Sequence, residues 1–311
     1  MIYTKSISEK RTYSKWGEQD LAVLKDHIEK KKALVIETLP PRGPDPKKYL
    51  DYVRSVWKIG VSAIAVTDMP LARIRVSPWA VSTLMIQEGM EVLPHFSRIT
   101  RNKCRVESDL LGFHILGVRN LLLLSGDDPN HGDYPDSSVV QDMSIYELIK
   151  LVKLMNTGTD LAGNKLNAST EFYVGAVFSH SFDEEIERVE RKVKAGADFL
   201  ISQPVFEKEK LQRFLDRLTV VPPVLVSTVV FKNRSQLSHF ASVPGIVLPK
   251  EFIDLLEEDR SDEYIKHYTT DYILKVVDEI HPYVSGIYVA GIVRDLSFMS
   301  QLSQLLASEE Y

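Results

Sequence analysis

Eight short apolar runs recur along this chain, with longer amphipathic stretches between them. The runs are rich in Val, Ile, Leu and Phe and stop abruptly at polar or turn-forming residues, which is typical of strands buried on both faces. The predicted strands cover residues 33–37, 62–67, 91–96, 120–125, 172–178, 198–203, 223–230 and 286–290. This alternation favours folds in which helices cover a parallel sheet.

The intervals between the runs carry helix signals. Ser181 and Glu184 form a capping-box pattern before a helix that Gly196 is placed to end. Ser144 and Glu147 repeat the same pattern before a second helix. We therefore expect a strand followed by a helix about eight times over.

That repeat predicts a single domain over residues 1–311, folded as a closed parallel (β/α)8 TIM barrel. An open doubly wound sheet is the alternative, but no strand is followed by G-x-G-x-x-G and a P-loop is absent. Residues 1–30 are expected to form an N-terminal helical extension, with its helix around 19–30. Residues 157–170 are expected to form an exposed loop or hairpin, and the helical segment 251–280 to be longer than the others.

Composition narrows the class of function. The formal net charge of -5 and the pI near 5.9 argue against nucleic acid or an anionic membrane as the main partner. Cys104 is the single cysteine, so the chain cannot form an internal disulfide or a Cys-rich metal site, and the histidines show no close pair at metal-ligand spacing. The polar first residues and the lack of an apolar run of about 20 residues predict a cytoplasmic protein.

Polar side chains stand at the ends of most predicted strands. Singly, each could be a core histidine, a strand-end cap or a turn former. In a barrel, however, the carboxyl ends of the strands converge on one pocket, where the chemistry sits. The residues concerned are Glu37, Thr67, Asp68, His95, Ser125, Asp127, Gln203, Ser227 and Thr228.

Glu37 is the most informative of these residues. It follows an apolar strand and precedes Leu39 and two prolines, so we expect a partly desolvated carboxyl that can hold a proton near neutral pH. Such a group suits a general acid. The alternative is a structural ion pair with Arg42.

The turn after the fourth strand has the same character. Four leucines run directly into Ser125, Gly126 and Asp127, so a sharp turn carries carboxylates at the mouth of the predicted barrel. A solvated turn is the alternative, because Asp, Gly and Pro are common turn formers.

Six blocks of the sequence occur in a specific order and spacing. They are IETLPP (36–41), AIAVTD (63–68), LPHFSRITRN (93–102), LLLSGDDP (122–129), KVKAGADFLISQPVF (192–206) and PGIVLPKEF (244–252). In these blocks the chain resembles the methylenetetrahydrofolate reductase family, most closely the reductase half of bacterial proteins that fuse it to a homocysteine S-methyltransferase. The likeness covers about residues 33–306, and the second activity of the fusion proteins is not implied because its cysteine ligands are missing.

The resemblance implies an FAD-dependent barrel enzyme. Hydride would pass from NADH or NADPH to the flavin, and from there to 5,10-methylenetetrahydrofolate, giving 5-methyltetrahydrofolate. By position, Glu37 matches the acid that helps to open the five-membered folate ring, and Gln203 matches a folate-binding glutamine. The remaining matches are flavin contacts, with Asp127 also catalytic: Thr67, His95, Ser125, Gly126, Asp127 and Lys192, the last at the diphosphate.

Two departures from the family pattern support an alternative. Ser125 stands where many reductases have an arginine, and the loop FSHSFDEE after the fifth strand looks shorter, so His180 matches no known contact. The alternative is a folate- and FAD-binding subunit that has no NAD(P)H-linked turnover of its own. It would receive electrons from a separate Cys-rich partner, since Cys104 alone cannot hold a cluster. A homo-oligomer is also compatible with the sequence.

Overall fold

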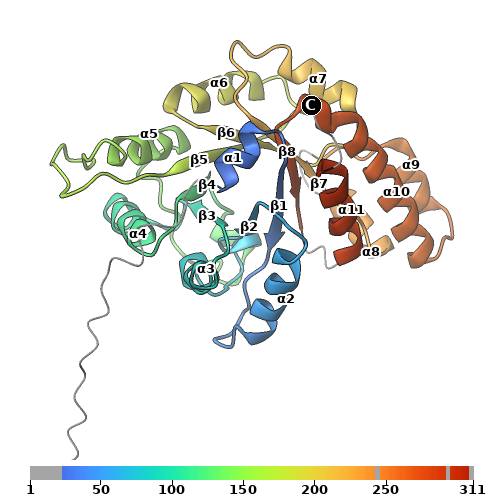
Figure 1. The fold of residues 1–311 in the computed structure, drawn as a ribbon, viewed down its shortest axis with the longest axis horizontal. Coiled ribbons are helices and arrows are strands. Elements are labelled where there is room, and N and C mark those ends of the chain that lie inside the picture. The colour runs from blue at the N-terminus through green and yellow to red at the C-terminus, as the bar shows by residue number, and fades with distance from the viewer. Residues whose placement is uncertain (1–22, 242–245, 292–294, 308–311) are drawn as a thin grey trace, which may run out of the picture.

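A computed structural model describes residues 23–241, 246–291 and 295–307 of the chain (Figure 1). Eight parallel strands pair in chain order, and β8 pairs with β1 to close the barrel. The strands are β1 Ala33–Thr38, β2 Ala63–Val66, β3 Val92–Ser97, β4 Asn120–Leu124, β5 Tyr173–Phe178, β6 Phe199–Ser202, β7 Val224–Thr228 and β8 Gly286–Val289. The predicted TIM barrel is confirmed, and all eight predicted strands are present, with ends that differ by at most two residues.

Helices pack against this barrel, and all of them except α1 lie on its outside. They are α1 Val23–Glu29, α2 Lys47–Trp57, α3 Pro78–Gln87, α4 Lys103–Ile115, α5 Ile145–Met155, α6 Glu185–Ala195, α7 Lys208–Leu215, α8 Arg234–Ala241, α9 Lys250–Glu257, α10 Asp262–Ile280 and α11 Leu296–Ala307. None of the helices in the described ranges is both long and apolar enough to cross a membrane.

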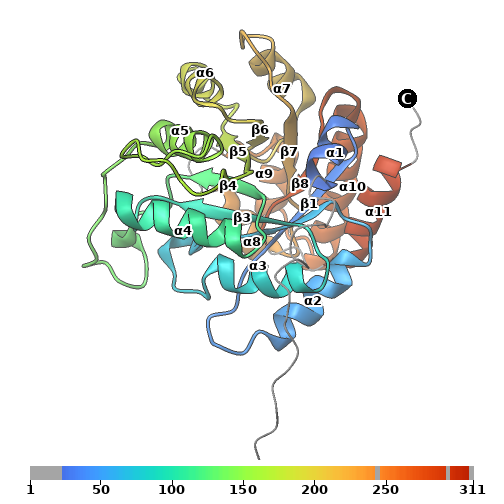
Figure 2. The same cartoon turned by 60° about the vertical axis from the view of Figure 1, so that its left-hand side comes forward.

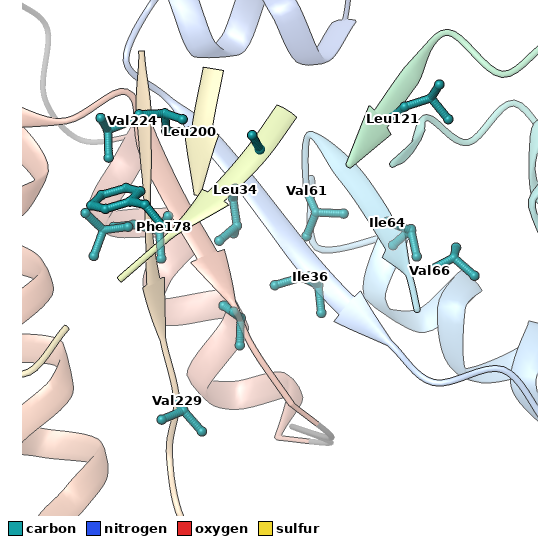
Figure 3. Close-up of a cluster of buried hydrophobic side chains, with 14 of the residues drawn as sticks. Leu34, Ile36, Val61, Ile64, Val66, Leu121, Phe178, Leu200, Val224 and Val229 are labelled. Carbon is teal, nitrogen blue, oxygen red and sulfur yellow. The ribbon is translucent and has the colours of Figure 1, made fainter. Parts of the chain in front are cut away.

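Alternate residues of each strand point to opposite sides of the sheet, which gives the barrel two apolar layers. Leu34 and Ile36 face outward with Ile64 and Val66 of the neighbouring strand, in the layer packed against the helices (Figure 3). The inner layer fills the barrel with Ala33, Val35, Ala63, Ala65, Leu93, Leu122, Phe199, Ile201, Leu225 and Tyr288. Residues that follow at every second position after this inner set also point toward the barrel axis, and at the carboxyl ends of the strands they lie at the barrel mouth.

Helix α1 packs on the inner layer rather than on the outer one. Its Leu24 and Ile28 are buried in the cluster that fills the barrel, and Figure 2 shows α1 beside β1 and β8. The predicted N-terminal helix is therefore confirmed over residues 23–29. Residues 19–22, like the rest of 1–22, lie outside the described residues.

The capping signals gave one correct and one wrong prediction. The box before α5 is present in full, with the Ser144 hydroxyl accepting from the Glu147 N–H and the Glu147 carboxylate accepting from the Ser144 N–H. The box at Ser181 and Glu184 is wrong, because residues 182–184 form a turn and α6 begins only at Glu185. The predicted stop is confirmed, since Gly196 ends α6 in the left-handed conformation.

Two other segments refine the sequence expectations. Residues 251–280 hold most of α9 and all of α10, two helices separated at residues 258–261. The segment is long, as predicted, and α10 with 19 residues is the longest helix in the described part of the chain. The 157–170 segment is a loop whose two arms touch through an antiparallel bridge between Thr159 and Lys165, as expected.

Gly175 on β5 is a position of the inner layer that only glycine fits. A Cβ at Gly175 would lie 2.5 Å from Cζ of Phe199, whose ring stacks on Tyr173 at 5.0 Å. We predict that Gly175→Ala lowers the free energy of unfolding by about 1–3 kcal/mol, through overpacking. We expect Phe199→Leu to recover part of this loss in the double variant, because the smaller side chain leaves room for the methyl group.

Urea unfolding followed by circular dichroism would measure both effects. Gly43→Ala is the matched control, because nothing lies within 4 Å of a Cβ there and its φ is not left-handed. Strictly additive effects of Gly175→Ala and Phe199→Leu would contradict the proposed clash.

Candidate functional site

The candidate site lies at the carboxyl ends of the strands, where the inner layer opens. Glu37, His95 and Gln203 are in step with the inner residues of β1, β3 and β6, so the pleat directs all three toward the barrel axis. Gln203 is half-buried, and its side-chain amide makes no hydrogen bond to the described part of the chain, which leaves it free for a ligand.

Strands β1, β3 and β8 contribute side chains to one hydrogen-bonded chain. The Tyr288 hydroxyl donates to Oε2 of Glu37 at 2.8 Å, and Nε2 of His95 lies 2.9 Å from the Tyr288 oxygen. The backbone N–H of Gly291 donates to Oε1 of Glu37 at 3.0 Å. Both oxygens of the Glu37 carboxylate are therefore held from β8 and the turn that follows it.

Burial determines the protonation states of Tyr288 and His95 in this hydrogen-bonded chain. The pKa of Tyr288 is raised well above its usual value by burial and then by the neighbouring Glu37 carboxylate. Burial lowers the pKa of His95, and the nearby carboxylates of Glu37 and Asp68 oppose this only in part. At neutral pH the phenol is thus protonated and the imidazole is neutral.

The ion pair considered for Glu37 is absent from the structure. Arg42 instead pairs with Asp133 at 2.6 Å, and Asp133 also accepts the backbone N–H of Ile74. The arginine that was the alternative partner of Glu37 therefore ties the loop after β1 to the loop after β4.

A buried ion pair joins the ends of β2 and β3. The Asp68 carboxylate accepts from the Arg101 guanidinium at 2.7 Å and from the Ser97 N–H at 3.0 Å. Arg101 also contacts Asp109 and lies over the ring of Phe96. The side chain of Asp68 is 1% exposed, so its charge depends on this partner.

Thr67 and the turn after β4 lie close to this pair. The Thr67 hydroxyl donates to the Thr38 carbonyl at 3.2 Å. Gly126 has φ +91°, and a Cβ there would lie 2.7 Å from Ile99, so the turn requires glycine. Asp127 is exposed, yet Oδ2 accepts the Leu71 N–H at 2.6 Å, which makes it more than a solvated turn residue.

Two further cavities flank the mouth. One, of about 290 Å³, lies between the ends of β4 and β5 and is lined by Ser125, Tyr146, Glu185, Arg188 and Lys192. The buried Nζ of Lys192 donates to the Val177 carbonyl at 2.7 Å and lies 3.9 Å from Glu185. Burial lowers the pKa of Lys192, with Glu185 acting in the opposite direction. Arg188 also pairs with Glu185, at 2.8 Å, so two cationic side chains face one carboxylate. The excess of positive charge makes this cavity suitable for an anionic group.

The other flanking cavity has about 370 Å³ and is mainly apolar. Val229, Val230, Phe231 and Phe240 line it together with Gly291, the residue whose N–H binds Glu37. An apolar volume is therefore in direct contact with the residue that positions the candidate acid.

His180 belongs to neither of these cavities. It lines a separate groove of about 520 Å³ beside α7, together with Lys210, Arg213 and Arg217. Its buried Nδ1 has no hydrogen-bond partner among the described residues, and burial, assisted by Lys210, lowers the pKa of His180 to about 4.

Sequence reasoning missed Tyr288 and Gly291. Tyr288 stands inside the apolar run 286–290, where a tyrosine also suits an ordinary core position, and Gly291 acts through its backbone. The available signal was the in-register position of Tyr288 on the inner face, which needs the strand pairing to be known. Within the described ranges, no group of three or more His, Cys, Asp or Glu side chains is placed to hold a metal ion.

Fold and strand-end chemistry together define a (β/α)8-barrel protein whose site lies at the carboxyl ends of its strands. A family model described as methylenetetrahydrofolate reductase matches residues 23–301. The chain belongs to this family.

Relatives of known name are distant. A "5,10-methylenetetrahydrofolate reductase" of Pectobacterium carotovorum subsp. carotovorum is 26% identical over 176 residues, covering 54% of this chain and 53% of the relative. A "Probable methylenetetrahydrofolate reductase (NADPH)" of Caenorhabditis elegans is 18% identical over 275 residues, covering 82% of this chain and 40% of the relative. The chain thus spans about half or less of the length of these two relatives.

Solved structures support the fold alone. A Clostridium thermocellum protein described as binding two copies of 5-methyl-5,6,7,8-tetrahydrofolic acid superposes with a TM-score of 0.58 at 10% identity, covering 90% of this chain and 99% of that one. A tryptophan synthase structure from M. tuberculosis gives a TM-score of 0.51 at 13% identity, covering 93% of this chain and 98% of that one.

The buried pair at the ends of β2 and β3 yields a stability prediction. Arg101→Met should lower the free energy of unfolding by about 3 kcal/mol or more, because it leaves the buried Asp68 carboxylate without its cation. Arg54→Met is the control, since Arg54 pairs with Glu88 at the surface and should leave the melting temperature nearly unchanged. Equal melting temperatures for the two variants would contradict this account.

Proposed function

We propose that the protein catalyses FAD-dependent reduction of 5,10-methylenetetrahydrofolate to 5-methyltetrahydrofolate, in the cytoplasm. The observation that carries this proposal is the Glu37 carboxyl, held by Tyr288 and Gly291 beside an apolar cavity in a barrel of the reductase family. A proton donor fixed at the barrel mouth is what opening of the folate ring needs.

The residues at the mouth suit the flavin in several respects. Lys192 and Arg188 supply positive charge for its diphosphate, and Ser125 and Gly126 lie on the turn beside them. The Oγ of Ser97 is buried at the same turn without a hydrogen-bond partner among the described residues, and the Thr228 hydroxyl is likewise buried and unpaired at the end of β7. When bound, FAD would supply the acceptance and donation of hydride.

Thr67 and His95 stay predictions as flavin contacts. The Thr67 hydroxyl is engaged with the Thr38 carbonyl and the His95 ring with Tyr288. A flavin at this place would contact these residues through their remaining atoms.

Side chains of the protein, as distinct from the flavin, would carry out the proton transfer, charge stabilisation and binding that the folate requires. Glu37 would deliver a proton to the bridging nitrogen N10, whose bond to the methylene carbon breaks as the five-membered ring opens. Asp127 would stabilise the cation that results, because its carboxylate lies exposed at the neighbouring mouth position. Gln203, with its free amide, would bind the folate.

A second candidate rests on the cysteine content and on Ser125. With Cys104 as the single cysteine, the chain holds no electron-transfer cluster of its own, and Ser125 places no positive charge at the turn where many reductases have arginine. In this version the barrel binds FAD and folate and takes electrons from a Cys-rich partner instead of NADH or NADPH.

The first test separates the two half-reactions of Glu37→Gln. The carboxamide is nearly isosteric, so we expect FAD binding and reduction by the electron donor to be unchanged. The rate of methylenetetrahydrofolate reduction should fall by about a hundredfold or more, because the proton donor is lost. Stopped-flow absorbance of the flavin measures both steps, and an unchanged folate rate would exclude Glu37 as the acid.

The second test identifies the electron donor. For the enzyme proposal, FAD-loaded protein should be bleached by NADH or NADPH and reoxidised by methylenetetrahydrofolate. Reduction by reduced ferredoxin alone would favour the partner-dependent version. Protein that binds no added FAD would contradict both.

A further inference from the structure

We propose that Tyr288 is a positioning residue for proton donation. It is the middle member of a hydrogen-bonded chain that runs from Glu37 to the buried His95, and it holds the Glu37 carboxyl in place. This inference rests on the proposed function, because it assigns to Tyr288 a role that acts through the acid of that reaction.

The geometry fixes the acid from two directions. Tyr288 on β8 binds Oε2 of Glu37 at 2.8 Å, and the Gly291 N–H binds Oε1 at 3.0 Å. The pairing of Val35 with Tyr288 sets the height of the phenol against β1. The plane of the carboxyl is thus determined by β8 and the turn after it, while β1 determines its depth in the barrel.

Proton counting gives this chain a direction. The Tyr288 hydroxyl has one proton, and its hydrogen bond to Oε2 of Glu37 uses it. The bond between His95 and Tyr288 must therefore be donated by Nε2–H of the imidazole, which fixes the neutral histidine as the Nε2–H tautomer. Each bond polarises the next, so His95 strengthens the phenol as a donor to Glu37.

Of the side chains near the Glu37 carboxyl, Tyr288 acts on it most directly, because the neighbouring charged groups are engaged with other partners. His95 faces the carboxylates of Glu37 and Asp68, and Arg101 neutralises Asp68. The charge that acts on Tyr288 is that of Glu37. Arg42 is engaged with Asp133 and does not take part.

Tyr288 and His95 are both well buried, at 3% and 6% exposure. Water therefore does not replace the phenol when it is removed. We expect Tyr288→Phe to leave a Glu37 carboxyl that has lost one hydrogen bond and turns more freely about its side-chain bonds.

The measured consequence is a change in the folate half-reaction only. In Tyr288→Phe we expect its maximal rate to fall about tenfold, the order of effect for a lost positioning contact. We also expect the pH at which this rate declines to move upward by about one unit, since one hydrogen bond to the ionised carboxyl is lost. Reduction of the flavin should keep its rate and its pH profile.

Tyr49→Phe is the matched control. Tyr49 is also buried, and its hydroxyl is hydrogen-bonded to the Thr38 hydroxyl at 2.8 Å, one residue along β1 from Glu37. This variant loses one buried phenolic hydrogen bond without touching the acid. A merely structural role of Tyr288 predicts the same behaviour for both variants.

A second variant tests the sign of the effect without a change in packing. With 3-fluorotyrosine at position 288, the phenol is a stronger donor, so the decline of the folate rate should move to lower pH, opposite to Tyr288→Phe. This variant keeps the test available if Tyr288→Phe does not fold.

A readout on the flavin-free protein complements the kinetics. The ring nitrogens of His95, assigned in 15N spectra by comparison with His95→Gln, should show the Nε2–H tautomer between about pH 6 and pH 8. Tyr288→Phe should shift these resonances and Tyr49→Phe should not. A wild-type His95 in the Nδ1–H tautomer would overturn the inferred chain.

The outcomes separate the two levels of the proposal. If wild-type protein with bound FAD does not reduce methylenetetrahydrofolate, the proposed function fails, and the role of Tyr288 fails with it. If the wild type turns over but Tyr288→Phe matches Tyr49→Phe in rate and pH profile, only the role of Tyr288 is overturned. Equal slowing of both half-reactions would also overturn it.

Discussion

Closure of the sheet between β8 and β1 is the interaction on which the candidate site depends. It brings Tyr288 to Glu37 across 251 residues of sequence. At the start of this seam, a Cβ on Gly286 would lie 2.2 Å from the Ala33 carbonyl oxygen, so the two backbones meet where no side chain fits. Once the seam is closed, the alternation of the pleat determines which residues face the axis, and the acid and its phenol follow from that register.

The remaining strand ends are tied together by polar contacts instead of apolar packing. Asp68 links β2 to β3 through Arg101 and Ser97, and Asp127 links the turn after β4 to the loop after β2. These contacts hold the mouth in one shape, while the apolar layers below supply most of the stability. Because polar contacts fix the mouth and apolar layers stabilise the barrel below it, the carboxylates at the mouth can have structural partners and still lie where a ligand would bind.

Most of the fold could be predicted from the sequence because a strand buried on both faces has a signal of its own. All eight runs are strands, and the Ser144 box and the Gly196 stop were read correctly. The Ser181 box failed because a tight turn, closed by backbone hydrogen bonds at 182–186, delays the helix. Local patterns do not reveal such competition.

The candidate site was predictable only in part, for a different reason. Glu37 and Asp127 are polar residues after apolar strands, and this contrast is visible in one sequence. The partners of Glu37 are a tyrosine inside an apolar strand and a backbone N–H, and neither contrasts with its neighbours. Such partners become visible only when the register of β8 against β1 is known.

The position of α1 has a consequence for the order of events at the site. Leu24 and Ile28 occupy the inner layer at the end opposite the strand-end residues, so in the described part of the chain α1 closes that end of the barrel. Any molecule that reaches Glu37 must enter and leave through the same opening. In kinetic terms, a large ligand at this mouth excludes the next one until it departs, so two bulky ligands that both need this opening are handled in turn.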